Sequence, residues 1–271
     1  MLILAGTPIG NIGDASARLI ETLQQATVIA AEDTRSLLKL ANHLGIKLSA
    51  ELISLNEQNE LQKLDRLIEI AKTENLVLVS DAGMPTISDP GFALVRACSE
   101  YGVEIQVVPG PSSVIAALAV SGLATDRFSF EGFIPRKSGE RKKLFQKLVS
   151  ESRTMIFFES PHRVSESLED AAKVFGPDRK ASLSRELTKK FEETLRGTLA
   201  ELAESSKDLK GEMVLVVAGA EQVQVATDAL VQKVLELRGA GSSLKDAARK
   251  VATEYGASTS ELYDLALKSN P

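Results

Sequence analysis

The sequence predicts an α/β protein with two α/β lobes and a small helical tail. Over the first 115 residues, short apolar runs rich in β-branched residues alternate with stretches whose apolar residues recur at the helical period. A second alternation of this kind begins near Ala124, and three short amphipathic segments follow residue 228. We therefore expect lobes at 1–122 and 123–222 and a helical, helix-turn-helix-like tail at 228–271.

The first lobe is expected to contain a mostly parallel sheet with right-handed crossovers, because its strands and helices alternate. Several of its strands are apolar at successive positions, as is typical when helices cover both faces of a sheet. The predicted strands are 2–6, 27–31, 51–55, 76–80 and 103–108. The predicted helices are 15–25, 35–44, 58–73 and 91–101.

The second lobe and the tail follow the same reasoning. The strands predicted in the second lobe are 127–133, 154–160, 180–187 and 212–219, and its helices are 140–150, 163–175 and 198–206. A polar stretch at 221–229 is interpreted as a linker. The tail helices are predicted at 229–238, 243–255 and 259–268, separated by glycines that suit turns and by Ser or Thr that suit N-caps.

Composition excludes several classes of protein. The 271 residues include 32 Lys and Arg against 37 Asp and Glu, a net charge of −5, so RNA contacts must come from local basic patches. The single cysteine, Cys98, excludes a disulfide framework, and two histidines argue against a zinc site. No apolar run approaches about 18 residues, so we expect a cytoplasmic protein without signal peptide or membrane span.

Four loops at the ends of predicted strands carry glycine, proline and small polar residues: 6–14, 31–35, 80–91 and 109–113. In an open parallel sheet, ligands bind beyond the carboxyl ends of the strands. The spacing G-x-x-x-G-x-x-G in 6–14 fits neither a Rossmann fingerprint nor a P-loop. Ordinary βα turns, and a structural salt bridge in 31–35, are the alternatives. Together the loops predict a cradle for a small uncharged or zwitterionic cofactor.

Helix capping explains part of these loops. Asp14 is expected to cap the following helix, and Asp89 followed by Pro90 is typical of an N-cap with proline at the first helical position. Ser112 or Ser113 is expected to begin a helix whose first N–H groups are free.

Basic residues gather in three segments of the second lobe, 131–143, 158–163 and 184–193. Such clusters are either solvated helix faces or phosphate contacts. With one arginine from the first lobe, the residues predicted to contact RNA are Arg35, Arg136, Lys137, Arg141, Lys142, Lys143, Arg163, Arg185 and Lys189.

Nine motifs in order carry a resemblance: GTPIGNIGD, AEDTR, SDAGMPTISDPG, VPGPSS, EGFIPRK, FFESPHR, RELTKKFEE, RGTL and GEMVLVV, within residues 2–219. They resemble the tetrapyrrole (corrin/porphyrin) methylase family of S-adenosyl-L-methionine-dependent enzymes, most closely its ribosomal RNA branch. The resemblance implies two αβα lobes with the cofactor in the cleft between them, as in class III methyltransferases, and a homodimer. It also implies 2′-O-methylation of a cytidine ribose in the decoding region of 16S rRNA, within the 30S subunit.

The resemblance also assigns cofactor contacts. Small-molecule members of the family have Gly-Asp-Pro where this chain has Gly83-Met84-Pro85, so one acidic contact is missing here. Backbone contacts from Asp81 to Ile87 remain available. The residues implied to bind the cofactor are Thr7, Pro8, Ile9, Asp81, Gly83, Met84, Ile87, Gly110, Ser112, Ser113, Phe158 and Ala218.

The chemistry of a ribose 2′-hydroxyl sets the catalytic requirement. This hydroxyl is a poor nucleophile, so the enzyme must align it with the methyl donor and remove one proton, and positioning should dominate. Carboxylates and unprotonated lysines near the loops could accept the proton, and no metal is needed. The unranked candidates are Glu32, Asp33, Asp81, Lys137, Glu159 and Lys190.

Two other functions remain open. One is a corrin or porphyrin methylase, which would need neither the basic segment 131–143 nor the tail. The other is a non-catalytic nucleic-acid-binding protein that uses the tail, but residues 228–271 hold six basic and six acidic side chains, which suits a DNA reader poorly. The tail can also be a dimer or packing element.

Overall fold

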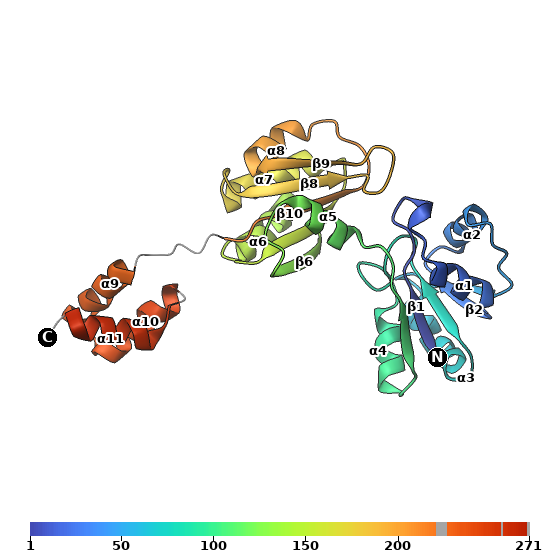
Figure 1. The fold of residues 1–271 in the computed structure, drawn as a ribbon, viewed down its shortest axis with the longest axis horizontal. Helices are drawn as coiled ribbons and strands as arrows, with labels where there is room; N and C mark the ends of the chain where they lie inside the picture. The colour runs from blue at the N-terminus through green and yellow to red at the C-terminus, as the bar shows by residue number, and fades with distance from the viewer. Residues whose placement is uncertain (221–226, 256, 270–271) are drawn as a thin grey trace. The chain divides into compact units, whose positions relative to one another are not determined.

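The computed structural model describes residues 1–220, 227–255 and 257–269, and most of the expected linker lies outside these ranges. The chain divides into two compact units, Met1–Gly219 and Ala220–Pro271 (Figure 1). The first contains both α/β lobes, each built on its own five-stranded sheet. The second contains the tail.

The sheet of the first lobe is fully parallel, as predicted. Its strands are β1 (Leu2–Ala5), β2 (Val28–Ala31), β3 (Glu51–Ser54), β4 (Leu76–Val79) and β5 (Ile105–Val108). They lie in the order β3-β2-β4-β1-β5. Helices α1 (Ala17–Gln25) and α2 (Thr34–His43) pack on one face, and α3 (Glu60–Thr73) and α4 (Phe92–Glu100) on the other.

This order creates a crevice between β1 and β4. The two strands are neighbours, but β1 continues into α1 on one face of the sheet and β4 continues into α4 on the other. The connections therefore diverge at the carboxyl ends of these strands, which is where open α/β sheets bind ligands. A short 3₁₀ turn, η1 (Ile12–Asp14), lies between β1 and α1.

The sheet of the second lobe is mixed. Its strands are β6 (Phe128–Phe133), β7 (Thr154–Glu159), β8 (Lys180–Arg185), β9 (Glu193–Thr198) and β10 (Met213–Val217). They lie in the order β6-β7-β10-β8-β9, and only β6 and β7 pair in parallel. The edge strand β9 is absent from the predicted strands. Since β10 runs antiparallel to β7 and β8, its first residues lie beside their last ones.

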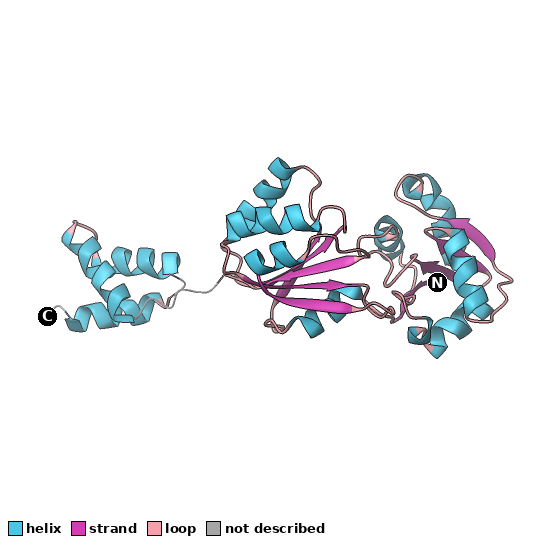
Figure 2. Ribbon diagram, turned by 90° about the horizontal axis from the view of Figure 1, so that it is seen from above, coloured by secondary structure: helices cyan, strands magenta, loops and turns pink. Residues whose placement is uncertain are grey.

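Helices cover both faces of the second sheet. Helices α6 (Ser138–Leu148), α7 (Val164–Phe175) and α8 (Leu199–Ser205) pack on one face, where Figure 2 shows helices stacked on the strands. Helix α5 (Ser113–Ser121) packs on the other face. It precedes the expected lobe boundary at residue 122, yet its buried apolar residues belong to the core of the second lobe.

The tail forms the three predicted helices, α9 (Thr227–Gly239), α10 (Leu244–Tyr255) and α11 (Thr259–Ser269). They enclose their own apolar core, in which Val234, Ala248 and Ala266 are fully buried. None of the helices in the described residues is long and apolar enough to cross a membrane.

Candidate active site

A cavity of about 620 Å³ lies between the loops of the first sheet and the ends of β7, β8 and β10. Its volume lies in the range typical of cofactor pockets. Seven residues implied to bind the cofactor line it: Ile9, Gly83, Met84, Ile87, Ser112, Ser113 and Phe158. The resemblance did not mark several other lining residues, among them Asp89, Phe133, Glu186, Lys189, Glu212 and Met213.

Thr7 and Gly83 hold the β1 and β4 loops together. Thr7 N–H donates to the Gly83 carbonyl (2.9 Å), and Gly83 N–H donates to the Thr7 carbonyl (3.1 Å). The Thr7 side chain is buried, and its hydroxyl donates to the Ser80 carbonyl (3.3 Å). Thr7 therefore fixes the cavity wall but is not part of its lining.

Gly110 is required by packing between loops. A Cβ atom on Gly110 would lie 2.7 Å from the Gly6 backbone, and one on Gly6 would meet Gly110 at the same distance. Gly110 is not among the lining residues of the cavity, and its implied contact with the cofactor stays a prediction. The loops after β1 and β5 pack so closely that neither accepts a side chain.

Acidic residues connect the ends of β2 and β4. The Asp33 N–H donates to Asp81 (3.2 Å), and the Asp81 N–H donates to Glu32 (3.3 Å). Burial and the neighbouring Asp81, Glu57 and Asp33 raise the pKa of Glu32. Arg35 forms an ion pair with Asp33, in which Arg35 Nη2 lies 2.7 Å from Asp33 Oδ2. The hydrogen bonds from Arg35 lower the pKa of Asp33 to about 2. Asp33 is therefore an ion-pair partner rather than a base. This agrees with the alternative interpretation of 31–35 as a structural salt bridge.

Asp89 lines the cavity, and its carboxyl group interacts with the Ser80 side chain. The predicted N-cap role is wrong, because α4 is capped from α3: Glu60 Oε1 accepts hydrogen bonds from the N–H groups of Gly91, Ala93 and Leu94. Burial, followed by the charges of Glu32 and Asp81, raises the pKa of Asp89 to about 6.

The cap predicted from Asp14 is also wrong. Asp14 belongs to the 3₁₀ turn η1, and the Ser16 hydroxyl accepts the Leu19 N–H (3.0 Å) at the start of α1.

The loop after β8 forms the opposite wall. Lys189 Nζ lies 3.1 Å from Glu186 Oε1 and 3.0 Å from Glu212 Oε2, so this predicted RNA contact is already paired with two carboxylates. The Thr188 hydroxyl accepts the Asn11 N–H (3.0 Å) and joins the two lobes.

Strained backbone flanks the cavity on both sides. Among the residues that the structure describes, five non-glycine residues have positive φ, and four of them lie in its loops: Thr86, Ser88, Glu186 and Thr188. Such strain is typical of binding and active sites, where the surrounding structure holds it in place.

Two predicted site residues of the second lobe lie at strand ends: Glu159 ends β7 and lines the cavity, and Ala218 follows β10. The Glu159 side chain is fully buried and accepts hydrogen bonds from Ser160 N–H (2.7 Å) and the Ser167 hydroxyl, besides pairing with Arg163. These contacts engage its carboxylate, and its role as a proton acceptor stays a prediction. Ala218 follows the last residue of antiparallel β10, whereas the cavity lies at the first, so Ala218 is not among the lining residues.

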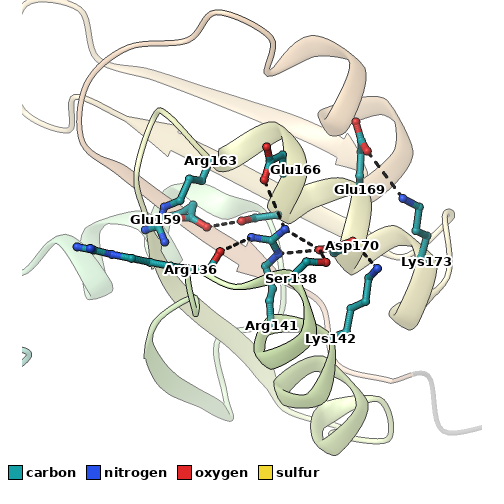
Figure 3. A network of polar contacts seen from close by, with 11 residues as sticks. Arg136, Ser138, Arg141, Lys142, Glu159, Arg163, Glu166, Glu169, Asp170 and Lys173 are labelled. Carbon is teal, nitrogen blue, oxygen red and sulfur yellow. Dashed lines mark hydrogen bonds and ion pairs between the residues drawn. The ribbon is translucent and has the colours of Figure 1, made fainter.

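Arg141 is the anchor of an ion-pair network between α6 and α7 (Figure 3). Its side chain is 2% exposed, and its Nη2 lies 2.6 Å from Asp170 Oδ2. Asp170 also accepts from the Ser138 hydroxyl (2.8 Å) and pairs with Lys142 (3.3 Å). A phosphate cannot reach a guanidinium buried in this way, so the predicted RNA contact of Arg141 is wrong.

The remaining predicted positive charges are exposed or partly exposed. Lys137 pairs with Glu140 (3.3 Å), Arg185 pairs with Glu193 (2.7 Å), and Lys190 lies over the ring of Phe191. Lys137 and Lys190 do not line the cavity, and their catalytic roles stay predictions.

Comparison with known proteins places this site in a family. The profile of the tetrapyrrole (corrin/porphyrin) methylases matches residues 1–203. The chain belongs to the tetrapyrrole methylase family.

Relatives with known names are similar to this chain over nearly its full length. Proteins named ribosomal RNA small subunit methyltransferase I are 44% identical in Mycobacterium tuberculosis (strain CDC 1551 / Oshkosh), covering 99% of this chain and 95% of the relative, and 43% identical in Escherichia coli O157:H7, covering 98% and 94%.

Solved structures share the fold. The methyltransferase CobJ has a TM-score of 0.61 at 20% identity, covering 81% of this chain and 94% of its own. A uroporphyrin-III C-methyl transferase from Thermus thermophilus, solved in complex with S-adenyl homocysteine, has a TM-score of 0.56 at 17% identity, covering 80% and 96%.

Proposed function

We propose that this chain transfers the methyl group of S-adenosyl-L-methionine to the 2′-hydroxyl of a cytidine ribose in the decoding region of 16S rRNA. We place the reaction in the cytoplasm, on the 30S subunit, with the enzyme as a homodimer. The observation that carries the proposal is 43–44% identity over 98–99% of the chain to proteins named for small-subunit ribosomal RNA. The tetrapyrrole enzymes of similar fold match only 80–81% of it.

The cavity fits the proposed cofactor. Helix α5 begins at Ser113, and no side chain caps it, so its first N–H groups and the hydroxyls of Ser112 and Ser113 suit a carboxylate. Ile9 and Phe158 supply apolar surface for an adenine ring. When bound, the cofactor supplies an electrophilic methyl group on a good leaving group.

The residues of the chain then have two tasks. The backbone pairing of Thr7 with Gly83 and the hydrogen bond between Asn11 and Thr188 fix the two walls, which orients a bound donor and excludes water. Asp89 accepts the proton of the 2′-hydroxyl, because its pKa of about 6 leaves it ionised at neutral pH yet more basic than an ordinary aspartate. Within the described residues, no group of three or more metal-ligating side chains is placed to hold a metal ion.

The test is methyl transfer from radiolabelled S-adenosylmethionine to 30S subunits that lack the modification, to free 16S rRNA and to a precorrin. We expect label in the RNA of the subunits and none in the precorrin. Label in the precorrin alone would assign the chain to the small-molecule methylases of its family.

A further inference from the structure

A second cavity of about 740 Å³ lies beside the first, at the ends of β6 and β7. The two cavities share Phe133 and Ser160. Arg136, His162 and Arg163 line the second cavity, and no carboxylate is among its lining residues in the described chain. The first cavity carries several carboxylates, so the two neighbouring spaces differ in charge and suit different chemical groups.

Arg163 is held rigidly with one donor unused. Its Nη2 lies 2.9 Å from Oε1 of the fully buried Glu159, as Figure 3 shows. Its Nη1 is buried and has no hydrogen-bond partner in the described part of the chain. A buried guanidinium nitrogen normally finds an acceptor, and a planar guanidinium fork matches the oxygens of a phosphate. The unused donor therefore points to an anionic ligand.

Two exposed side chains complete the cluster. In residues 1–220, 227–255 and 257–269, neither Arg136 nor His162 uses its side chain in a hydrogen bond or ion pair. Arg136 and Arg163 extend to the same side in Figure 3, away from Asp170. Helix α7 begins at Val164 with no side-chain cap, and a helix N-terminus favours anions.

We propose that this second cavity is a phosphate subsite, which binds the RNA backbone phosphate next to the ribose that is methylated. The inference rests on the proposed function. A ribose bound at the first cavity is joined to the backbone phosphates through its own oxygen atoms. The second cavity lies directly beside the first. Phe133, 60% exposed and in contact with both spaces, offers its ring to the sugar or base between them.

The test uses Arg136→Gln and His162→Gln, with Arg127→Gln as the matched control. Arg127 is also exposed and precedes the opposite end of β6, so its replacement removes the same charge away from the cavity. Binding of the full chain to unmethylated 30S subunits is measured over a series of KCl concentrations. We expect Arg136→Gln to lower the log–log salt slope by about 0.7–0.9 and to raise the KM for subunits, while the Kd for S-adenosylmethionine stays unchanged.

Arg163→Lys adds a second readout. It keeps the positive charge beside Glu159 but loses the fork, so we expect a raised KM for subunits with normal cofactor binding. If wild-type protein methylates subunits and Arg136→Gln has the slope and KM of Arg127→Gln, the phosphate subsite is overturned. If wild-type protein transfers no methyl group to subunits or free rRNA, the proposed function fails, and the subsite fails with it.

Discussion

At the scale of single residues, the cavity sets the chemistry of Asp89. This carboxyl group binds its proton more tightly in the folded chain, where its pKa is about 6, than in the unfolded chain, where it is 3.8. Ionising it therefore costs folding free energy, and the stability of the wild type should fall as pH rises from about 4 to about 6. This cost to the fold agrees with the proposed role of Asp89 in the reaction.

Replacing Asp89 by Asn should separate these effects. Above pH 6 the variant should be more stable by about 1–2 kcal/mol, because the unfavourable charge is gone. Its kcat should fall about 100-fold, the lower end for loss of a general base, with an unchanged Kd for S-adenosylmethionine. Urea unfolding at pH 4 and pH 8 and single-turnover methylation measure both.

The pH dependence of kcat shows whether Asp89 acts as the base. Wild-type kcat should decline below about pH 6, and the residual activity of Asp89→Asn should lack that decline. A variant that keeps wild-type kcat, or one that is less stable at pH 8, would contradict the assignment of Asp89.

Gly110→Ala tests the contact between the loops. Its Cβ would lie 2.7 Å from the Gly6 backbone, so the loops must separate, at a cost of about 1–3 kcal/mol in stability. Cofactor affinity should fall as well, because the displaced loops carry the cavity wall. Gly139→Ala is the control, since its Cβ meets nothing within 4 Å and α6 favours alanine. Equal melting temperatures for the two variants would contradict the close packing.

Predicted site residues line the cavity where a motif fixes the position of the backbone, and the sequence misleads where burial decides the role of a side chain. Ile9, Gly83 and Ser112 line the cavity because strand ends bring their loops together. Arg141 is of a residue type usual at the surface, but it is buried in its pair with Asp170 of α7, 29 residues along the chain. Charge along a sequence does not report such long-range pairing.

At the scale of elements, α4 depends on a cap from another helix. Glu60 Oε1 accepts three N–H groups of α4, at 3.0–3.3 Å. Glu60→Ala should lower the free energy of unfolding by about 1–2 kcal/mol. Glu69→Ala, which removes only an exposed pair with Lys72 on the same helix, should change it by less than about 0.5 kcal/mol. Urea unfolding measures both, and similar losses would contradict the capping role.

The first sheet follows from the sequence, and the second does so only in part. Successive apolar residues and helical periods predict the strands and helices of the first lobe because both faces of its sheet are buried. Strand direction in the second lobe depends on pairing partners that are distant in sequence. Because β10 is antiparallel to β7 and β8, its end next to the cavity is Met213 and not the end that precedes Ala218. The edge strand β9 is partly exposed and contains Gly197, so its sequence has no run of apolar residues that would predict a strand.

At the scale of the whole molecule, the tail is a separable unit. It has its own core, and residues Met1–Gly219 form a compact unit that contains the cavity. Truncation after Gly219 should leave the Kd for S-adenosylmethionine within about twofold while methylation of 30S subunits falls sharply, because we expect the tail to help dock the large substrate. Calorimetry and subunit methylation measure these. A folded truncated chain with the wild-type rate on subunits would contradict the docking role.

The most direct test of the proposed function is the identity of the methylated nucleoside. Unmethylated 30S subunits are incubated with the full chain and S-adenosylmethionine, and their 16S rRNA is digested to nucleosides and analysed by mass spectrometry. We expect close to one 2′-O-methylcytidine gained per subunit, from the decoding region, with far less from Asp89→Asn. A base-methylated nucleoside, or no methylated nucleoside from protein that binds the cofactor, would contradict it.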